Sequence, residues 1–294
     1  MEKKLIAVLG ATGQQGKGVV EALKKNGSLK VRAITRNPDK YNGNADEVVL
    51  GDLTRPDSLV NAFKGAYGVF VVTNFWESAD EINQGKAAIE AAKVANVTHF
   101  IWSTLPNVEE ISKGKFEVPH FTGKSMVDEA VKAAGFTYYT FVQPPFYFQN
   151  LGGQLGPQKQ QDGSLGWALP LDPSKKVIHM ADINDLGKVV TGAFLNPEKV
   201  GKGSYLSLAE GFYSFNDILT AFKANGKEYS FTYIPAEVFS KFPFPGADEL
   251  TQMFSYFEEN TYMGPNADER IKLAKEIATE EFTSLDKWIK EKTN

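Results

Sequence analysis

One stretch near the start of the chain, residues 3–27, limits the fold more than any other. An apolar run, Leu5–Leu9, ends at Gly10, and two more glycines, Gly13 and Gly16, precede apolar residues at helical spacing. This order predicts a buried strand, a tight turn and the start of a helix. Glycine serves a separate purpose at each position: a sharp turn, close approach of backbone to a pyrophosphate, and close packing of the helix on the strand.

The glycine spacing, G-x-x-G-x-x-G, is one residue wider than the G-x-G-x-x-G fingerprint of dinucleotide-binding folds. A helix N-terminus has unpaired N–H groups and the positive end of a dipole, so a phosphate is its natural ligand. With a strand before it and a helix after it, the turn at residues 10–16 predicts a dinucleotide phosphate site.

The residue after the second predicted strand indicates which dinucleotide binds. Arg36 follows the strand Lys30–Thr35 and lies twenty positions after Gly16. NAD-preferring folds place an acidic residue here to bind the ribose 2′-hydroxyl, whereas a cation accommodates the 2′-phosphate of NADP. Lys40 adds a second cation in the same loop. The pattern favours NADP(H), and the alternative is an arginine that is simply solvated in a loop.

Two further strand ends place polar residues beside the predicted crevice. Asp52 follows the strand Glu47–Leu50, where its carboxylate can accept a hydrogen bond from an adenine amino group or can stabilise a turn or helix end. Residues 66–73 form a nearly continuous apolar run, which is typical of a central parallel strand. That strand ends at Thr73, Asn74 and Phe75, which we expect to line the cofactor.

The alternation of strands and helices predicts the fold class. Helices over residues 57–64 and 79–96 alternate with strands at His99–Ser103 and residues 137–142. Such repeats predict an α/β fold of Rossmann type, a doubly wound parallel sheet with helices on both faces. We expect residues 1–153 to form this NAD(P)-binding domain, with its core continuing over 177–195. Residues 154–294 are predicted to form a smaller α+β C-terminal part that binds a substrate or partner.

Three further segments lie outside the predicted phosphate site. Residues 104–119 form a long polar loop, which is either functional or a disordered surface segment. Residues 109–115 lack evident apolar anchors, so we expect cofactor binding to change the order of this loop. The aromatic run at 239–244 is either an apolar binding wall or part of a minor core. Residues 283–292 form an amphipathic helix.

The composition excludes several classes of protein. The chain has 294 residues, 42% of them hydrophobic, and a net charge of −4, which suits one large α/β domain with a smaller appendage. It has no cysteine, which excludes disulfides and thiolate catalysis, and its three histidines give no reason to predict a metal. Without a basic run we expect no nucleic-acid partner, and without a long apolar run we expect a soluble, cytoplasmic protein with no membrane association.

A second informative stretch opens a helix with His120 and Lys124. Val127 and Val131 continue the same helical face, so this face is expected to pack on the sheet. His120 and Lys124 lie at its start, near the carboxyl edge of the sheet. We therefore expect Lys124 to meet the cofactor rather than water.

Together these blocks resemble the NmrA-like family of atypical short-chain dehydrogenase/reductases, and in particular its branch of NADP(H) redox sensors. The blocks are GATGQQG at 10–16, TRNP at 35–38, VTNFWES at 72–78, HFTGK at 120–124, PPFYFQN at 144–150 and FPGADEL at 244–250. The resemblance implies a cytoplasmic and nuclear protein with a homodimer responsive to NADP(H) and a regulatory protein partner. It assigns cofactor contacts to Gly10, Thr12, Gly13, Gln14, Gln15, Arg36, Asn37, Lys40, Asp52, Leu53, Thr73, Asn74, Phe75, Lys124, Tyr147, Phe148, Gln149 and Asn150.

One departure from the reductase pattern bears on activity. Active short-chain reductases carry Tyr-x-x-x-Lys on this helix, with the tyrosine as general acid, and here His120 occupies the tyrosine position. Ser103 and Lys124 retain the other two catalytic parts, and an imidazole can still donate a proton. The sequence therefore favours an NADP(H)-binding redox sensor. The alternative is an NADPH-dependent reductase of a small aromatic, quinone or carbonyl substrate.

Overall fold

The first strand and helix form as the glycine pattern predicts. In the computed structural model, which describes residues 2–77, 80–160 and 162–293, β1 (Leu5–Leu9) is buried and leads through a turn into α1 (Gln14–Asn26). Gly10 has a φ of 76°, which other residues rarely adopt. A Cβ on Gly16 would lie 2.1 Å from the Gly10 carbonyl oxygen. The first glycine therefore makes the turn, and the third lets the helix pack against it.

The main sheet confirms the Rossmann prediction. Across the described residues, seven strands form one sheet in the order β11-β6-β5-β4-β1-β2-β3, and every neighbouring pair is parallel. The strand order reverses at β1 and β4, so the ligand crevice of a doubly wound fold is expected at their carboxyl ends. The other strands are β2 (Lys30–Thr35), β3 (Glu47–Leu50), β4 (Gly68–Val71), β5 (His99–Ser103), β6 (Tyr138–Gln143) and β11 (Lys202–Ser207).

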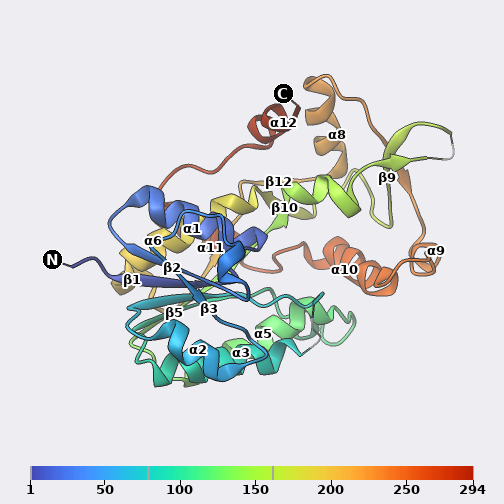
Figure 1. The fold of residues 1–294 in the computed structure, drawn as a ribbon. Helices are drawn as coiled ribbons and strands as arrows, with labels where there is room; N and C mark the ends of the chain where they lie inside the picture. The colour runs from blue at the N-terminus through green and yellow to red at the C-terminus, as the bar shows by residue number, and fades with distance from the viewer. Residues whose placement is uncertain (1, 78–79, 161, 294) are drawn as a thin grey trace.

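Helices cover both faces of this sheet (Figure 1). On one face lie α1, α6 (Leu186–Leu195) and α11 (Ala267–Ile277), and on the other lie α2 (Pro56–Phe63), α3 (Glu81–Val94) and α5 (Pro119–Ala133). Residues 78 and 79, where the VTNFWES block ends and the predicted helix begins, lie outside the described residues. Short helical segments join the layers: η1 (Pro38–Lys40), α4 (Val108–Ile111), η4 (Ile183–Asp185) and α7 (Pro197–Val200).

The remaining elements form a smaller part, called here the C-terminal lobe, to the right of and above the sheet in Figure 1. Its strands are β7 (Phe146–Tyr147), β8 (Gln158–Lys159), β9 (Leu165–Leu169), β10 (Ile178–Ala181), β12 (Gly211–Tyr213) and β13 (Ser230–Tyr233). Its helices are η2 (Phe148–Leu151), η3 (Gly153–Leu155), α8 (Phe215–Ala224), α9 (Ala236–Phe239), α10 (Ala247–Asn260) and α12 (Leu285–Thr293).

Aromatic side chains build the core of the C-terminal lobe. Trp167, Phe254 and Phe257 are buried there, together with Trp288 of α12, as the amphipathic pattern of the last helix predicts. Phe239 is also buried in this core, so the run at 239–244 contributes packing rather than only an exposed wall. Two later elements, β11 and α11, belong to the layers of the main sheet. The sequence analysis had placed both in the smaller C-terminal part.

The segment between β5 and α5 is anchored more firmly than the sequence predicts. Leu105, Val108, Phe116 and Val118 are buried in the core of the C-terminal lobe. Even in the polar middle of the segment, Ile111 packs against that core and Lys115 forms an ion pair with Glu259. The expectation that residues 109–115 lack apolar anchors is therefore wrong. A single apolar residue, Ile111, stands among polar ones, and the sequence does not show that it packs on the core.

Candidate cofactor-binding site

The phosphate end of the predicted crevice is the turn between β1 and α1. Gly13 is the N-cap of α1, and its N–H donates to the Gly10 carbonyl oxygen at 2.9 Å. Within the part of the chain that the structure describes, no side chain caps this helix and its first turn has no acidic residue. Thr12 and Gln14 are exposed beside it. The backbone N–H groups of the first turn therefore fit a pyrophosphate.

Gln15 joins two other predicted site residues. Its Oε1 accepts a hydrogen bond from Ser103 Oγ at 2.6 Å, and its Nε2 donates to the Tyr147 hydroxyl at 2.9 Å. These residues come from α1, β5 and β7, so the fold brings together groups far apart in sequence. Burial raises the pKa of Tyr147 to about 12, although the bond from Gln15 opposes this shift. Tyr147 is therefore protonated at neutral pH and can donate a hydrogen bond.

Lys124 is buried and held entirely by protein groups. Its Nζ donates to the Thr73 carbonyl oxygen at 2.8 Å, to Thr73 Oγ1 at 3.0 Å and to Glu81 Oε1 at 2.6 Å. These bonds use all three N–H donors of the ammonium group. Burial lowers the pKa of Lys124, and the adjacent carboxylate of Glu81 counteracts part of that shift. Removing one partner of such a buried pair is costly, because the other charge then lacks compensation.

Glu81 is a site residue that the sequence analysis missed. It is 1% exposed and opens α3, eight positions after Thr73. Besides accepting from Lys124, its Oε1 accepts a hydrogen bond from Thr73 Oγ1 at 2.6 Å. The only sequence signal is a carboxylate at the start of a helix, which ordinarily indicates a favourable helix end. Its pairing with Lys124 depends on the packing of α3 against α5.

His120 is held by the C-terminal lobe. Its Nδ1 lies 2.6 Å from Glu249 Oε1, and its backbone N–H donates to the same oxygen at 3.0 Å. Both side chains are 13% exposed. The His120 ring also lies 5.3 Å from the Trp76 ring and 6.0 Å from the Phe75 ring, between centroids. The helix face that continues from His120 packs on the sheet as predicted, but its imidazole bonds to α10 because Glu249 reaches the first turn of α5.

The three catalytic candidates are held by different partners. Ser103 bonds to Gln15, Lys124 bonds to Thr73 and Glu81, and His120 bonds to Glu249. Among the described residues, no hydrogen bond joins any two of Ser103, His120 and Lys124. In this structure, the hydroxyl, the imidazole and the ammonium group are therefore each fixed by a different neighbour.

At the adenosine end, Arg36 forms an ion pair with Glu77, with Nη2 and Oε2 3.0 Å apart. Both side chains are more than half exposed, so this pair contributes little stability and can readily exchange partners. Lys40 and Asn37 lie nearby on the same exposed loop, at η1 and its N-cap. These cations fit a 2′-phosphate.

Asp52 supports a turn in this structure. Its Oδ1 accepts hydrogen bonds from the Thr54 backbone N–H at 2.9 Å and from Thr54 Oγ1 at 2.8 Å. The bond from the Thr54 backbone is the main cause of the lowered pKa of Asp52. Leu53, next in the chain, is half-buried. In this structure Asp52 therefore has the second of its two predicted roles, stabilising a turn. Its other carboxylate oxygen, Oδ2, lies 3.5 Å from Arg55 Nε.

The segment at 144–150 has a mixed role. Phe148 is 0% exposed and its ring centroid lies 5.7 Å from that of Trp288, so its side chain belongs to the core of the C-terminal lobe, while a cofactor contact at this residue stays a prediction. Gln149 donates to Asp182 Oδ1 at 2.8 Å and accepts from the Ile183 N–H, which fixes the turn after β10. Asn150 is half-buried, whereas Asn74 of the β4 exit is exposed.

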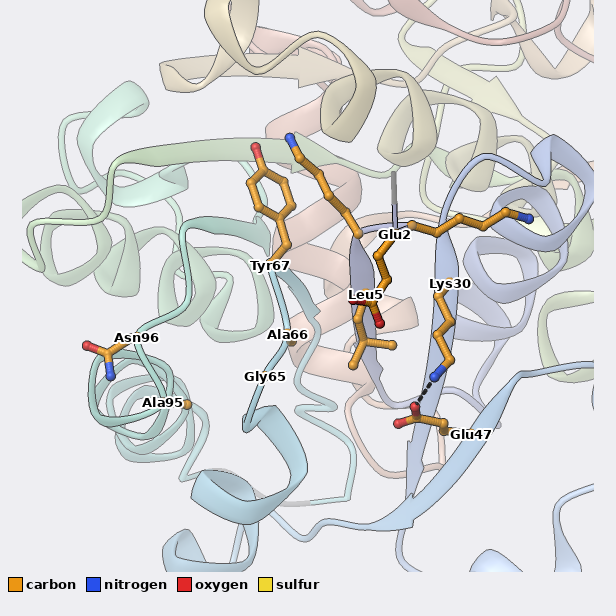
Figure 2. Close-up of a pocket in the computed structure, with 11 residues that line it drawn as sticks. Glu2, Leu5, Lys30, Glu47, Gly65, Ala66, Tyr67, Ala95 and Asn96 are labelled. Carbon is orange, nitrogen blue, oxygen red and sulfur yellow. Dashed lines mark hydrogen bonds and ion pairs between the residues drawn. The ribbon is translucent and has the colours of Figure 1, made fainter.

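A cavity of 640 Å³ lies at the opposite, amino-terminal edge of the sheet. Figure 2 shows Lys30 turned toward Glu47, with which it pairs at 2.6 Å, while Tyr67 lies on the other side of β1. Lys4 lies over the Tyr67 ring at 3.8 Å. Lys30 and Lys4 thus have separate partners and do not converge on one point. None of the predicted cofactor residues lines this cavity within the described chain.

Among residues 2–77, 80–160 and 162–293, no group of three or more His, Asp or Glu residues is placed to hold a metal ion. No helix in those ranges combines the length and apolar character needed to cross a membrane.

Comparison with known proteins covers nearly the whole chain. Residues 2–289 match the model of the NmrA-like family. An NmrA-like family domain-containing protein of Dictyostelium discoideum is 29% identical, over 99% of this chain and 98% of its own. The NmrA-like oxidoreductase FrzB of Cladobotryum sp is 28% identical, over 90% and 88% of the two chains.

Solved structures show the same fold. Crystals of NmrA, a negative transcriptional regulator, match with a TM-score of 0.83 and 24% identity, over 99% of this chain and 95% of that one, and NmrA is also known in complex with NADP. The triphenylmethane reductase of Citrobacter sp, complexed with NADP(H), matches with a TM-score of 0.75 and 20% identity, over 97% and 99%. From the extent of the family match, this chain belongs to the NmrA-like family.

Proposed function

We propose that this protein binds NADP(H) and acts as a redox sensor, coupling the NADPH or NADP⁺ state of its cofactor to association with itself or a protein partner. The observation that carries the proposal is that Ser103, Lys124 and His120 are each held by a different partner. A general acid must reach the proton acceptor on its substrate. With His120 bonded to Glu249 and the donors of Lys124 all used, the geometry favours binding over turnover.

The residues at the carboxyl edge of the sheet fit NADP(H). The first turn of α1 would hold the pyrophosphate, and Arg36 would exchange the Glu77 carboxylate for the 2′-phosphate. The NmrA regulator and the triphenylmethane reductase, both crystallised with NADP or NADP(H), support this choice. When bound, the cofactor would supply a transferable hydride in a reductase. In a sensor it would supply two states, NADPH and NADP⁺, whose nicotinamide rings differ in charge.

Coupling to other proteins would pass through the junction between α5 and α10. Glu249 bonds to both the backbone and the ring of His120, and Trp76 at the β4 exit packs on that ring. A cofactor that contacts Phe75 at this strand end would bias the packing of the C-terminal lobe. It can do so only to the extent that it binds one arrangement better than the other. Homodimer formation and a cytoplasmic and nuclear location are part of the same proposal, by family resemblance.

The test combines binding, turnover and association in one set of conditions. Calorimetric titration with NADPH and NADP⁺ measures affinity, absorbance of the reduced nicotinamide measures turnover with a panel of quinones and carbonyls, and sedimentation measures association. We expect saturable binding, negligible oxidation of NADPH, and a mass distribution that differs between the two cofactor states. Rapid substrate-dependent oxidation, or the same mass distribution in both states, would contradict the sensor.

A reductase of a small aromatic, quinone or carbonyl substrate is the second candidate. It is favoured by relatives named as oxidoreductases and by the hydroxyl of half-buried Tyr147, which is linked to Ser103 through Gln15. Enzymes typically turn over at roughly 1–10³ s⁻¹. A rate in that range with any member of the panel would select the reductase.

A further inference from the structure

A cavity of 350 Å³ lies between the start of α3, the segment before α5 and the first turns of α5. Its volume falls within the range of about 300–1,000 Å³ that is usual for small-molecule sites. Apolar side chains supply much of the wall, among them Phe75, Ile82, Phe116, Val118 and Met126. Such a wall suits a compact aromatic or aliphatic body.

Two unpartnered polar atoms belong to residues that line this cavity. Glu81 lines it and is 1% exposed, and its Oε2 has no hydrogen-bond partner among the described residues. The other oxygen, Oε1, accepts from Lys124 and Thr73. The Oγ1 atom of Thr122, also in the lining, is buried and likewise without a partner in the described chain. Buried polar atoms are nearly always hydrogen-bonded, so these two atoms are open to a donor that the described residues do not supply.

The charge of the lining favours a cation. Glu109 and Glu117 are exposed glutamates at this cavity, and Glu81 adds a third carboxylate. Among the described residues of the lining there is no lysine, arginine or histidine. Lys124, which is outside the lining, pairs with Glu81 at 2.6 Å, so Glu109 and Glu117 carry the excess negative charge that favours an ammonium group over an anion.

We propose that this cavity binds a small organic amine, with its apolar body against Phe116 and Met126 and its ammonium group donating to Glu81 Oε2 and Thr122 Oγ1. The glycine turn and Arg36, which fit the cofactor phosphates, contribute nothing to this lining, and Phe75 is common to both predicted sites. The amine site is therefore distinct from the phosphate-binding end of the crevice.

Binding there has a consequence for the buried ion pair. An ammonium group at Oε2 shares the Glu81 carboxylate with Lys124 and weakens the ion pair between Glu81 and Lys124. If NADP(H) binds as proposed above, the amine and the cofactor then change each other's affinity by the same factor, because coupling between two sites is reciprocal. This coupling rests on the proposed function, whereas amine binding itself does not.

The test uses 2-phenylethylammonium as the probe, with 2-phenylethanol and phenylacetate as neutral and anionic analogues of similar shape. Amide NMR titrations are made on the full chain without cofactor, so failure of NADP(H) binding leaves the result unaffected. A hydrogen bond to a charged group contributes about tenfold or more in affinity. We therefore expect the ammonium to bind at least tenfold more tightly than either analogue, with shifts centred on residues 81–82 and 116–126.

Gly123→Ala is the variant that probes the contact directly. A Cβ at this position would lie 3.3 Å from Glu81 Oε2, in the space that a donor would use, while leaving the bond from Oε1 to Lys124 in place. We expect about a tenfold loss of affinity. Glu129→Gln is the matched control, since Glu129 lies on the same helix, is exposed and is absent from the lining.

Thr122→Val is a second, isosteric variant. It still tests the proposed contact with the ammonium group if Gly123→Ala fails to fold. It removes only the hydroxyl, and we expect about a threefold to tenfold loss of affinity for the ammonium and no change for phenylethanol. Equal affinity for the three probes, shifts centred elsewhere, or unchanged binding in the folded variants would overturn the proposal.

Discussion

The two ends of the predicted cofactor crevice are built in different ways. The phosphate end is made of backbone from one continuous stretch, in which Gly10 makes the turn and Gly13 caps α1. The other end is made of side chains from separate elements, with Lys124 of α5 paired to Glu81 of α3 and His120 bonded to Glu249 of α10.

This difference separates what is fixed locally from what depends on packing. A backbone turn needs glycines at set positions and little else, so it survives changes in its surroundings. A buried ion pair needs both partners in place, since either charge alone is unfavourable. The second end is therefore where substitutions have the larger effect on folding, and where cofactor binding can alter the arrangement of the C-terminal lobe.

The largest effect is expected from breaking the buried pair. Glu81→Leu leaves the Lys124 ammonium without its carboxylate in a buried site, and we expect the free energy of unfolding to fall by about 3–5 kcal/mol. Urea denaturation measures this change. Glu129→Leu, at an exposed pair with Lys132, should change stability by less than about 0.5 kcal/mol.

A double variant sharpens this prediction. Glu81→Leu combined with Lys124→Met removes both charges and should recover most of the lost stability. If Glu81→Leu lowered the free energy of unfolding by less than about 1 kcal/mol, the ion pair between Glu81 and Lys124 would not be needed to hold this end of the crevice together.

A pH dependence is expected further along α5. Burial raises the pKa of Asp128 to about 7, with hydrogen bonds from Thr104 and Tyr205 opposing the shift. Because the folded pKa exceeds the unfolded one, the contribution of this group to stability is full below about pH 4 and is lost as the pH rises to 7, by about 1.4 kcal/mol per unit.

Asp128→Asn removes this titration and retains an acceptor for the Tyr205 hydroxyl. We expect the stability of the variant relative to the natural chain to rise by about 2–3 kcal/mol between pH 5 and pH 7. Urea denaturation at both pH values measures the difference, and the contributions of His99 and His179, which are present in both proteins, cancel. A constant difference would show that Asp128 does not titrate in this range.

At the adenosine end, where Arg36 lies, the expected effect is on affinity and not on folding. Arg36→Ala removes a charge-assisted contact to the 2′-phosphate, which contributes about 1.5–3 kcal/mol, or roughly one to two decades in the dissociation constant for NADPH. NADH has no such phosphate, so its affinity should be unchanged. Calorimetry with both cofactors tests this. An equal loss of affinity for NADPH and NADH would show that Arg36 does not bind the 2′-phosphate.

The smallest effect is expected at the partner of Arg36. Glu77→Gln frees the guanidinium from an exposed ion pair, which contributes about 0.2–1 kcal/mol. We expect NADPH to bind up to about fivefold more tightly in this variant, as measured by the same calorimetry. Weaker binding would mean that Glu77 orients Arg36 for the cofactor instead of competing with it.

The sequence predicts the phosphate end well and the other end only in part. The order of strand, glycine turn and helix is local, so the fold class, α1 and the exposed position of Arg36 follow from residue spacing. Glu81 and Glu249 were missed because their roles depend on which helices meet in space. The burial of the Phe148 side chain in the core of the C-terminal lobe could not be predicted, because an aromatic residue beside a strand end looks the same in sequence whether it faces a ligand or a core.

Hydrogen exchange tests the central claim most directly, by comparing the two ends in the apo, NADPH-bound and NADP⁺-bound protein. The sensor requires cofactor binding to reach the C-terminal lobe through the contact of His120 with Glu249. We predict that exchange slows at residues 10–16 in both bound states, and that exchange at residues 119–124 and 247–253 differs between NADPH and NADP⁺. Protection confined to residues 10–16 and 35–37, and equal for the two cofactors, would contradict this account.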